Sequence, residues 1–221
     1  MIKTALFDFD GTLVNTDAAH HACWNLSLAQ YGVSIDAPFF GAHCAGSLTP
    51  DIARHIKQVF PAVSASVEAF ASEKDGRYVD WAESNTLPLM VGVREMLAFL
   101  AEKEIILGIV TGAPLTAIRK TLDQNGISGY FSTIVTRENI SRGKPAPDGY
   151  LLGLERLGAV GQEAVAFEDT SSGVQAARAA AMTAIAVPQV YTLNHDFSAA
   201  DFVCRDMFAT KAVLMKMISL D

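Results

Sequence analysis

The sequence predicts a doubly wound α/β fold, in which a parallel sheet is covered by helices on both faces. Three observations support this prediction. Short apolar segments alternate with longer segments of helical periodicity, which is typical of a parallel sheet with helical crossovers. The apolar segments are bounded by turn-forming or polar residues, as expected of buried strands. The alternation is interrupted once, after the first strand, by a long stretch that carries only helical patterns.

The expected strands and core helices follow from these patterns in chain order. The strands are residues 4–9, 105–110, 133–136, 164–167 and 183–187. Helical spacing of apolar residues occurs at residues 93–102, 115–125, 149–157 and 172–181. The last helical pattern, residues 207–218, predicts an amphipathic helix that packs on the core.

The interrupting stretch predicts a separate helical insertion. Its helical candidates are residues 18–31, 50–59 and 66–82, and hinges are expected near residues 14–16 and 84–86. We therefore expect a core formed by residues 1–16 and 85–221, and an inserted helical cap formed by residues 17–84.

The charge balance restricts the partners of the chain. The 221 residues are 50% hydrophobic and 19% charged, which provides ample material for a core. The formal net charge is −7, whereas affinity for nucleic acid depends on a basic surface. We therefore expect no nucleic-acid partner. A small phosphorylated substrate is compatible with this charge, because one lysine and a metal ion can reverse the sign within a pocket.

The cysteines and the apolar segments indicate a reducing setting. Cys23, Cys44 and Cys204 are odd in number and lack CxxC spacing, which argues against a disulfide framework or a zinc site. The start of the sequence has no signal-peptide pattern, and no apolar run reaches transmembrane length. We expect a cytoplasmic protein without membrane contact, as a monomer or weak homodimer.

Four polar clusters lie at or beyond the carboxyl ends of predicted strands, where ligands bind in open α/β sheets. They are Asp8-Phe9-Asp10-Gly11-Thr12, Thr111-Gly112, Gly143-Lys144-Pro145, and Glu168-Asp169-Thr170-Ser171-Ser172-Gly173. Together they supply acids for a metal ion, a nucleophile, a hydroxyl, backbone donors and a cation. Phosphoryl transfer needs this set, because it depends on positioning and on neutralising the charged phosphoryl oxygens.

The first cluster places two acids close together. Because side chains alternate along an extended backbone, Asp8 and Asp10 are expected on the same side. Two carboxylates this close repel each other unless a cation lies between them or one holds a proton. One can then attack phosphorus while the other transfers a proton. Gly11 permits the sharp turn that follows.

In these four clusters the chain resembles the haloacid dehalogenase-like hydrolase superfamily, and within it the β-phosphoglucomutase-like and sugar-phosphatase branch. The segment from Asp8 to Leu13 matches the first family motif completely, and Thr111 matches the hydroxyl-bearing second motif. Lys144 in Gly-Lys-Pro-Ala-Pro-Asp matches the third, and Glu168-Asp169 matches the fourth. The resemblance covers essentially the whole chain and implies a Rossmann-like core with an inserted cap that sets substrate specificity.

The resemblance assigns the chemical steps to the first cluster. It implies that Asp8 is the nucleophile and forms an aspartyl-phosphate. It implies that Asp10 protonates the leaving alcohol, deprotonates the attacking water and lends its backbone carbonyl to the metal ion. Asp10 also favours a phosphatase or phosphomutase over a dehalogenase, since a halide leaves without a proton whereas an alkoxide needs an acid.

The resemblance assigns phosphate and metal binding to the other clusters. Thr111 and the Gly112 amide are implied to hold phosphate oxygens, and Lys144 to neutralise charge on Asp8 and the phosphoryl group. Asp169 is implied to bind Mg²⁺ together with Asp8 and Asp10, and Glu168 to assist directly or through water. An all-oxygen ligand set suits Mg²⁺.

The cap offers candidate specificity residues. For each of them, the alternative role is packing. His20 and Trp24 lie in a segment similar to the His-x-x-Ala-Trp element near the hinge of β-phosphoglucomutase-like caps, and Thr16 precedes it. His20 either senses closure and places Asp10, or fixes the hinge beside Trp24. Thr49 stands where mutases of this branch carry an arginine for a second phosphate, and a neutral residue cannot offer that bidentate fork.

These observations predict a magnesium-dependent phosphatase of a small phosphorylated metabolite, with a sugar phosphate as the expected substrate. The alternatives are a phosphomutase of the β-phosphoglucomutase type and a non-catalytic binding protein that kept the fold. Each catalytic position holds a competent residue, which argues against the non-catalytic alternative.

Overall fold

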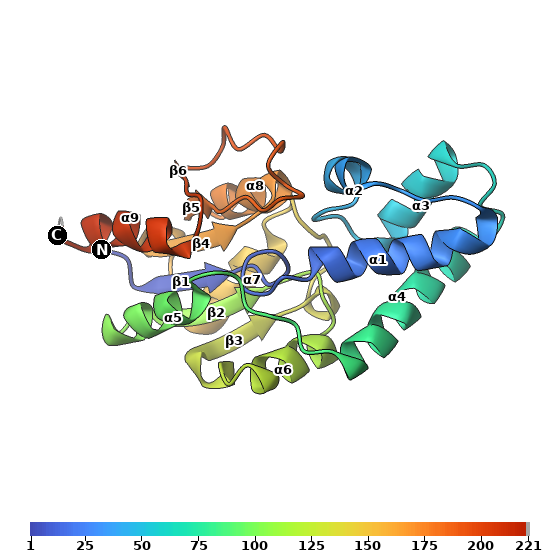
Figure 1. Ribbon diagram of the computed structural model, residues 1–221. Helices are drawn as coiled ribbons and strands as arrows, with labels where there is room; N and C mark the ends of the chain where they lie inside the picture. The colour runs from blue at the N-terminus through green and yellow to red at the C-terminus, as the bar shows by residue number, and fades with distance from the viewer. Residues whose placement is uncertain (220–221) are drawn as a thin grey trace.

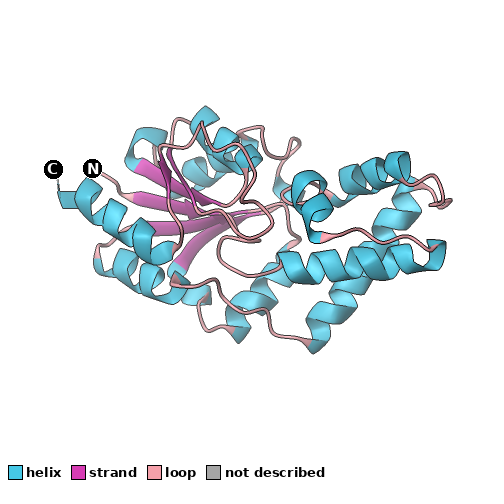
Figure 2. Cartoon of the chain, turned by 45° about the horizontal axis from the view of Figure 1, so that its top comes forward, coloured by secondary structure: helices cyan, strands magenta, loops and turns pink. Residues whose placement is uncertain are grey.

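The computed structural model describes residues 1–219 as a parallel sheet with helices on both faces (Figure 2). The strands are β1 (Thr4–Phe7), β2 (Ile106–Val110), β3 (Phe131–Val135), β4 (Ala164–Glu168), β5 (Thr183–Ala186) and β6 (Phe202–Val203). Their order in the sheet is β3-β2-β1-β4-β5-β6, and each neighbouring pair is parallel. The predicted doubly wound fold is confirmed.

Alternate residues of each central strand face opposite helical layers, as a strand buried on both sides requires. Phe7 of β1 packs in a cluster with side chains of α5 (Val93–Glu102), α6 (Leu115–Gln124) and α9 (Met207–Ser219). Leu6, its neighbour, packs in a second cluster on the other face with α7 (Asp148–Leu157) and α8 (Ser171–Ala179). The carboxyl ends of the strands are thereby held at one edge, where the polar clusters follow.

The helices between β1 and β2 that precede α5 form a body with its own apolar interior, which we call the cap. They are α1 (Asp17–Leu28), α2 (Ala37–His43), α3 (Thr49–Val59) and α4 (Val67–Ser84). Trp24, Leu28, Ile56 and Phe70 are fully buried in a cluster separate from both core clusters. Figure 1 shows these helices at the end of the sheet opposite the chain termini. Within residues 1–219, no helix combines the length and apolar character needed to cross a membrane.

Helix α2 and strand β6 were not predicted from the sequence, and neither were three short 3-10 helices. Helix α2 begins where Asp36 accepts a hydrogen bond from the Phe39 amide (2.8 Å), followed by a proline in the first turn. Seven residues that include a glycine are too few to show helical periodicity. Strand β6 has two residues and is exposed, so no apolar run marks it. The five predicted strands and the predicted helices are present, with ends that differ by at most three residues.

Candidate active site

Asp8 follows β1 directly and is held by the sheet edge. Its amide donates to the Phe167 carbonyl at 3.0 Å, so the chain is still fixed by β4 one residue beyond the strand. Gly11 then turns the chain with a φ of +76°, and a Cβ there would lie 2.2 Å from Asp169 Oδ2. Only glycine allows both this backbone conformation and this close approach. The turn therefore brings the Asp10–Gly11 backbone against the acid of the fourth cluster.

Three buried carboxylates meet at this edge. Asp8, Glu168 and Asp169 each offer one oxygen, and these atoms lie within 4.8 Å of one another. Burial raises the pKa of the Glu168 carboxyl to about 7 and that of Asp169 well above its usual range, with Asp8 adding to both shifts. Asp169 Oδ1 is buried without a hydrogen-bond partner within the described residues. Hard oxygen ligands with an unsatisfied negative charge fit a divalent cation such as Mg²⁺.

Lys144 is the cation of the cluster. Its Nζ contacts Asp8 Oδ1, lies 2.7 Å from Glu168 Oε1 and donates to the Val110 carbonyl at 3.2 Å. Burial opposes its charge, but Asp8 and Glu168 outweigh burial and raise the pKa of Lys144 above its usual value. The lysine therefore stays charged beside Asp8. When all three carboxylates are ionised, the lysine neutralises one of the three charges, and the site is net negative.

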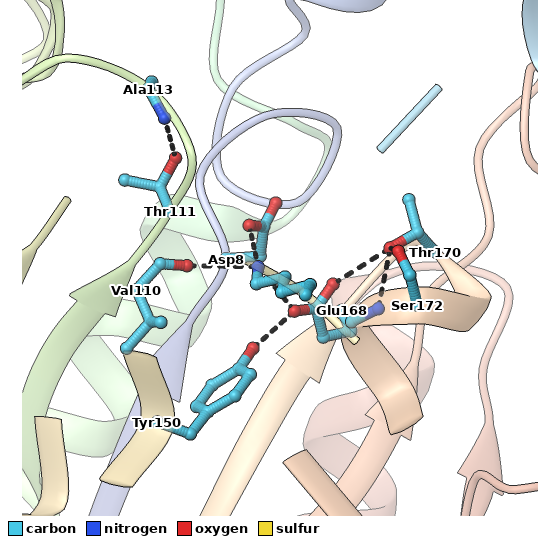
Figure 3. A network of polar contacts seen from close by, with 10 residues as sticks. Asp8, Val110, Thr111, Ala113, Tyr150, Glu168, Thr170 and Ser172 are labelled. Atoms are coloured by element: carbon cyan, nitrogen blue, oxygen red, sulfur yellow. Dashed lines mark hydrogen bonds and ion pairs between the residues drawn. The ribbon is translucent and has the colours of Figure 1, made fainter. Parts of the chain in front are cut away.

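Glu168 is fixed from two sides, as Figure 3 shows. The Tyr150 hydroxyl donates to Glu168 Oε1 from one side, and the Thr170 hydroxyl lies 3.5 Å from Oε2 on the other. Gly173 lets the carboxylate lie against the start of α8, since a Cβ there would be 1.9 Å from Oε2. Because Oε1 is already shared by Tyr150 and Lys144, this oxygen is less free than Asp169 Oδ1 to bind a cation.

The second cluster presents donors at the end of β2. The Thr111 hydroxyl accepts from the Ala113 amide at 2.9 Å, which leaves its proton free to donate to another group. The Thr111 amide donates a hydrogen bond to the Val135 carbonyl, so the start of the loop is fixed to β3. Gly112 follows at the cavity wall. A hydroxyl and a backbone amide of residues that line one cavity are suited to binding phosphate oxygens.

Asp10 lies two residues after Asp8 and faces the same cavity. Burial raises the pKa of its carboxyl to about 6, and the charge of Asp8 contributes. An acid with a pKa in this range can both give and take a proton near neutral pH. The structure thus brings the predicted residues Asp8, Asp10, Thr111, Gly112, Lys144 and Asp169 to the wall of one cavity, with Glu168 directly behind Lys144.

The cavity has a volume of about 670 Å³ and is walled by both the core and the cap. On the cap side, Lys74 of α4 is 3% exposed and lies 3.0 Å from His20 Nδ1. His20 stacks on Tyr78 with ring centroids 3.9 Å apart, and its Nε2 lies 4.0 Å from Asp10 Oδ1. Burial, together with Lys74, lowers the pKa of His20 well below its usual value. A neutral His20 therefore lies between Lys74 and Asp10.

The candidate specificity residues of the cap have different surroundings. Trp24 lines the cavity but packs on Phe70, with ring centroids 5.3 Å apart. Thr49 lines the cavity and donates to Asp75 Oδ1 at 3.0 Å. Thr16 is fully buried at the start of α1, outside the cavity wall. The structure brings His20, Trp24 and Thr49 to the cavity and leaves Thr16 behind it.

Several side chains of the site were not found from the sequence. Lys74 lies four residues before Tyr78 on a predicted helix, which places both residues on one face but does not indicate that the lysine is buried. Asp17 is buried and lines the cavity, and burial with the charge of Asp10 raises its pKa to about 7. Arg137, in a short turn after β3, also lines the cavity. Their direction depends on how the cap packs, which leaves no sequence signal.

Comparison with known proteins identifies relatives along almost the entire chain. The profile of the family described as haloacid dehalogenase-like hydrolase matches residues 5–187. The fructose-1-phosphate phosphatase YqaB of Escherichia coli is 32% identical over 182 residues, which cover 82% of this chain and 94% of that protein. The validoxylamine A 7'-phosphate phosphatase of Streptomyces hygroscopicus is 28% identical, over 94% of this chain and 95% of that protein.

The fold is also found among solved structures. The β-phosphoglucomutase from Clostridium difficile superposes with a TM-score of 0.82 at 23% identity, over 100% of this chain and 99% of that one. At this identity the likeness concerns the fold.

Proposed function

The chain belongs to the haloacid dehalogenase-like hydrolase family, and we propose that it is a magnesium-dependent phosphatase of a small sugar phosphate that acts through Asp8. The observation that carries the proposal is the contact of Asp8 with Lys144 at the edge of a cluster of three carboxylates. A buried, charge-paired acid beside a cation site is suited to attack phosphorus. The names of the two phosphatase relatives support a phosphate ester as substrate.

In the first step, Asp8 Oδ attacks phosphorus and the bond between phosphorus and the ester oxygen breaks. The leaving alkoxide takes the proton of Asp10, whose pKa of about 6 allows it to hold one. Lys144 and the donors of Thr111 and Gly112 hold the equatorial oxygens as their charge develops. Mg²⁺ held by Asp8, Asp169 and the Asp10 backbone carbonyl would neutralise further phosphoryl charge.

In the second step, water attacks the aspartyl-phosphate and gives its proton to Asp10. The bond between phosphorus and Asp8 breaks, which restores the carboxylate and releases inorganic phosphate. His20, held by Lys74 at 3.0 Å, lies 4.0 Å from Asp10, so it comes within hydrogen-bond distance of this carboxyl if the cap closes slightly further. Because His20 and Lys74 belong to the cap, Asp10 is positioned for both steps only while the cap is closed on the core.

The residues around Thr49 favour hydrolysis over a phosphomutase. Thr49 donates to Asp75, which is an acid rather than a phosphate. Arg54, the nearest arginine along α3, is more than half exposed and pairs with Asp51 at 2.6 Å. It does not belong to the cavity wall. A second phosphate therefore lacks the bidentate partner that a mutase needs at this place.

A phosphate-release assay over a panel of sugar phosphates, nucleotides and phosphorylated small acids tests the proposal. With Mg²⁺, release is expected from one or more sugar phosphates and is expected to stop when a chelator is added. A parallel assay with a sugar monophosphate and catalytic bisphosphate scores isomer instead of free phosphate. No release from any ester with Mg²⁺ present, or isomer in place of phosphate, would overturn the proposal.

A further inference from the structure

Arg137 and Asp75 face each other across the cavity, one from the core and one from the cap. Arg137 lies in the turn after β3, and Asp75 lies on α4 next to Lys74. Both line the cavity, at 43% and 39% exposure, and Arg137 NH1 lies 4.0 Å from Asp75 Oδ2. This separation is too long for a hydrogen bond, so each group keeps bonding capacity toward the cavity.

The other basic groups of the described cavity wall are already engaged. Lys144 contacts Asp8 and Glu168, and Lys74 is almost fully buried against His20 and Asp75. Lys120 donates to the Ala82 carbonyl at 2.8 Å. Among the cations that line the cavity within residues 1–219, Arg137 therefore differs in that its charged partner, Asp75, lies too far away for a hydrogen bond.

The two groups have opposite bonding character. A guanidinium only donates hydrogen bonds and an ionised carboxylate only accepts them, whereas a hydroxyl does both. A hydroxyl placed between them accepts from Arg137 and donates to Asp75. Adjacent hydroxyls on neighbouring carbons can use the two nitrogens of the guanidinium fork and the Oδ2 oxygen of Asp75, since Oδ1 already accepts from Thr49 and Lys74. The pair is thus complementary to a neutral polyol.

We propose that Arg137 and Asp75 bind the hydroxyls at the far end of a polyol monophosphate and select this substrate class. The inference rests on the proposed function, because it concerns the part of the substrate beyond the phosphoryl group. A second phosphate only accepts hydrogen bonds and is repelled by the Asp75 carboxylate. An ammonium group only donates and is repelled by Arg137. A neutral hydroxylated tail satisfies both residues, and Thr49, bonded to Asp75 at 3.0 Å, holds the acid in place.

The test compares substrates with and without such a tail. Fructose 1-phosphate and sorbitol 6-phosphate carry hydroxyls, whereas p-nitrophenyl phosphate has none. The variants are Arg137→Met, Asp75→Asn and the double variant. The controls are Arg142→Met, in the same loop but outside the cavity wall, and Asp80→Asn, an exposed residue of the same helix. The amide introduced by Asp75→Asn can still accept from Thr49, which keeps the local structure.

Each variant is expected to lower kcat/KM for the polyol phosphates by about tenfold or more, mainly through KM, because a hydrogen bond between the substrate and a charged group is lost. For p-nitrophenyl phosphate the change is expected to stay within about twofold. The double variant should lose less than the product of the single losses, since both residues hold the same hydroxyls. The two control variants should match the unmodified enzyme on all three substrates.

Equal losses on all three substrates would overturn the inference, because they would show that the pair only joins the cap to the core. Unmodified enzyme that prefers p-nitrophenyl phosphate to both polyol phosphates would also overturn it, while leaving the phosphatase function intact. Absence of hydrolysis of all three esters would instead contradict the proposed function itself. The failures of the two proposals are therefore distinguishable.

Discussion

Contacts between acidic and basic side chains are shorter within the sheet edge than across the cavity, from the edge to the cap. Lys144 lies 2.7 Å from Glu168 and in direct contact with Asp8. Across the cavity, both His20 to Asp10 and Arg137 to Asp75 span 4.0 Å. The edge is built by strands of one sheet, whereas the cap has a separate apolar interior.

This difference assigns separate tasks to the two regions. Groups that must hold phosphorus within a narrow geometry lie on one rigid element, where a small displacement costs much of the rate. The groups that we propose to contact the rest of the substrate lie on the cap and the core, which have separate apolar interiors, and we propose that these two regions move apart to admit the substrate and release the product. Changes at the edge should therefore affect every substrate, and changes on the cap should depend on the substrate.

Replacement of Lys144 by methionine is expected to have a large effect that is equal for all substrates. The variant removes the cation that contacts Asp8 and Glu168, and the phosphoryl charge loses a partner. We expect kcat to fall about 10²- to 10³-fold for sugar phosphates and for p-nitrophenyl phosphate alike. Steady-state kinetics with Lys3→Met as the surface control measures this. A loss confined to one substrate would contradict the division between edge and cap.

Replacement of Asp10 by asparagine is expected to separate the two chemical steps. With a sugar phosphate, the leaving alkoxide lacks its acid, and kcat should fall about 10²-fold or more. Nitrophenolate is a weak base and leaves without a proton, so the first step should survive with p-nitrophenyl phosphate. Rapid mixing should then show a burst equal to the enzyme concentration, followed by slow turnover. Equal loss of the first step with both esters would contradict the acid role of Asp10.

Replacement of Asp17 by asparagine is expected to have the smallest effect on activity and a measurable effect on stability. Burial raises the pKa of this acid in the folded state to about 7 from 3.8. Because the carboxyl pKa is higher in the folded state, the fold loses stability as the pH rises above the pKa of the unfolded state. The loss is complete once the pH exceeds the pKa of the folded state. The variant should therefore be more stable at pH 8 by at most about 4 kcal/mol, and unchanged near pH 4.

Urea unfolding in the presence of a chelator measures this difference, because a bound cation would itself stabilise the acids. Asp80→Asn, on an exposed position of α4, serves as the control. A gain at pH 4 that equals the gain at pH 8 would show that the Asp17 charge is not the cause.

The polar residues that gather at the edge of the sheet could be predicted from the sequence for a physical reason. Buried parallel strands must be apolar, so the polar residues that follow each one are visible as breaks, and their carboxyl ends must meet at one edge. Asp8, Thr111 and Asp169 therefore come together in space although 161 positions separate the first from the last. The fold class was predicted from the same pattern, and the family from the resemblance of the four clusters to its motifs; both are confirmed.

The cap wall could not be predicted in this way. Helical periodicity shows that α4 has a buried face, but not that Lys74 lies on it beside His20. A buried lysine looks like a surface lysine in the sequence, because the long apolar stem suits both settings. Arg137 lies in a short turn without periodicity, and its contact with Asp75 depends on the position of the whole cap. The bounds of the core and the cap, 1–16 with 85–221 and 17–84, stay predictions, as do the roles of the site residues.

The kcat of Asp8→Asn with Mg²⁺, on each ester that the unmodified enzyme cleaves, tests the central claim most directly. Asparagine keeps the shape of the residue and removes the charged nucleophile. Asp51→Asn, an acid of α3 that is more than half exposed, is the control. We expect at least about a 10³-fold loss on every ester, because no other group forms the bond to phosphorus. Substantial turnover of any ester by Asp8→Asn, with the control unchanged, would contradict the assignment of Asp8 as the nucleophile.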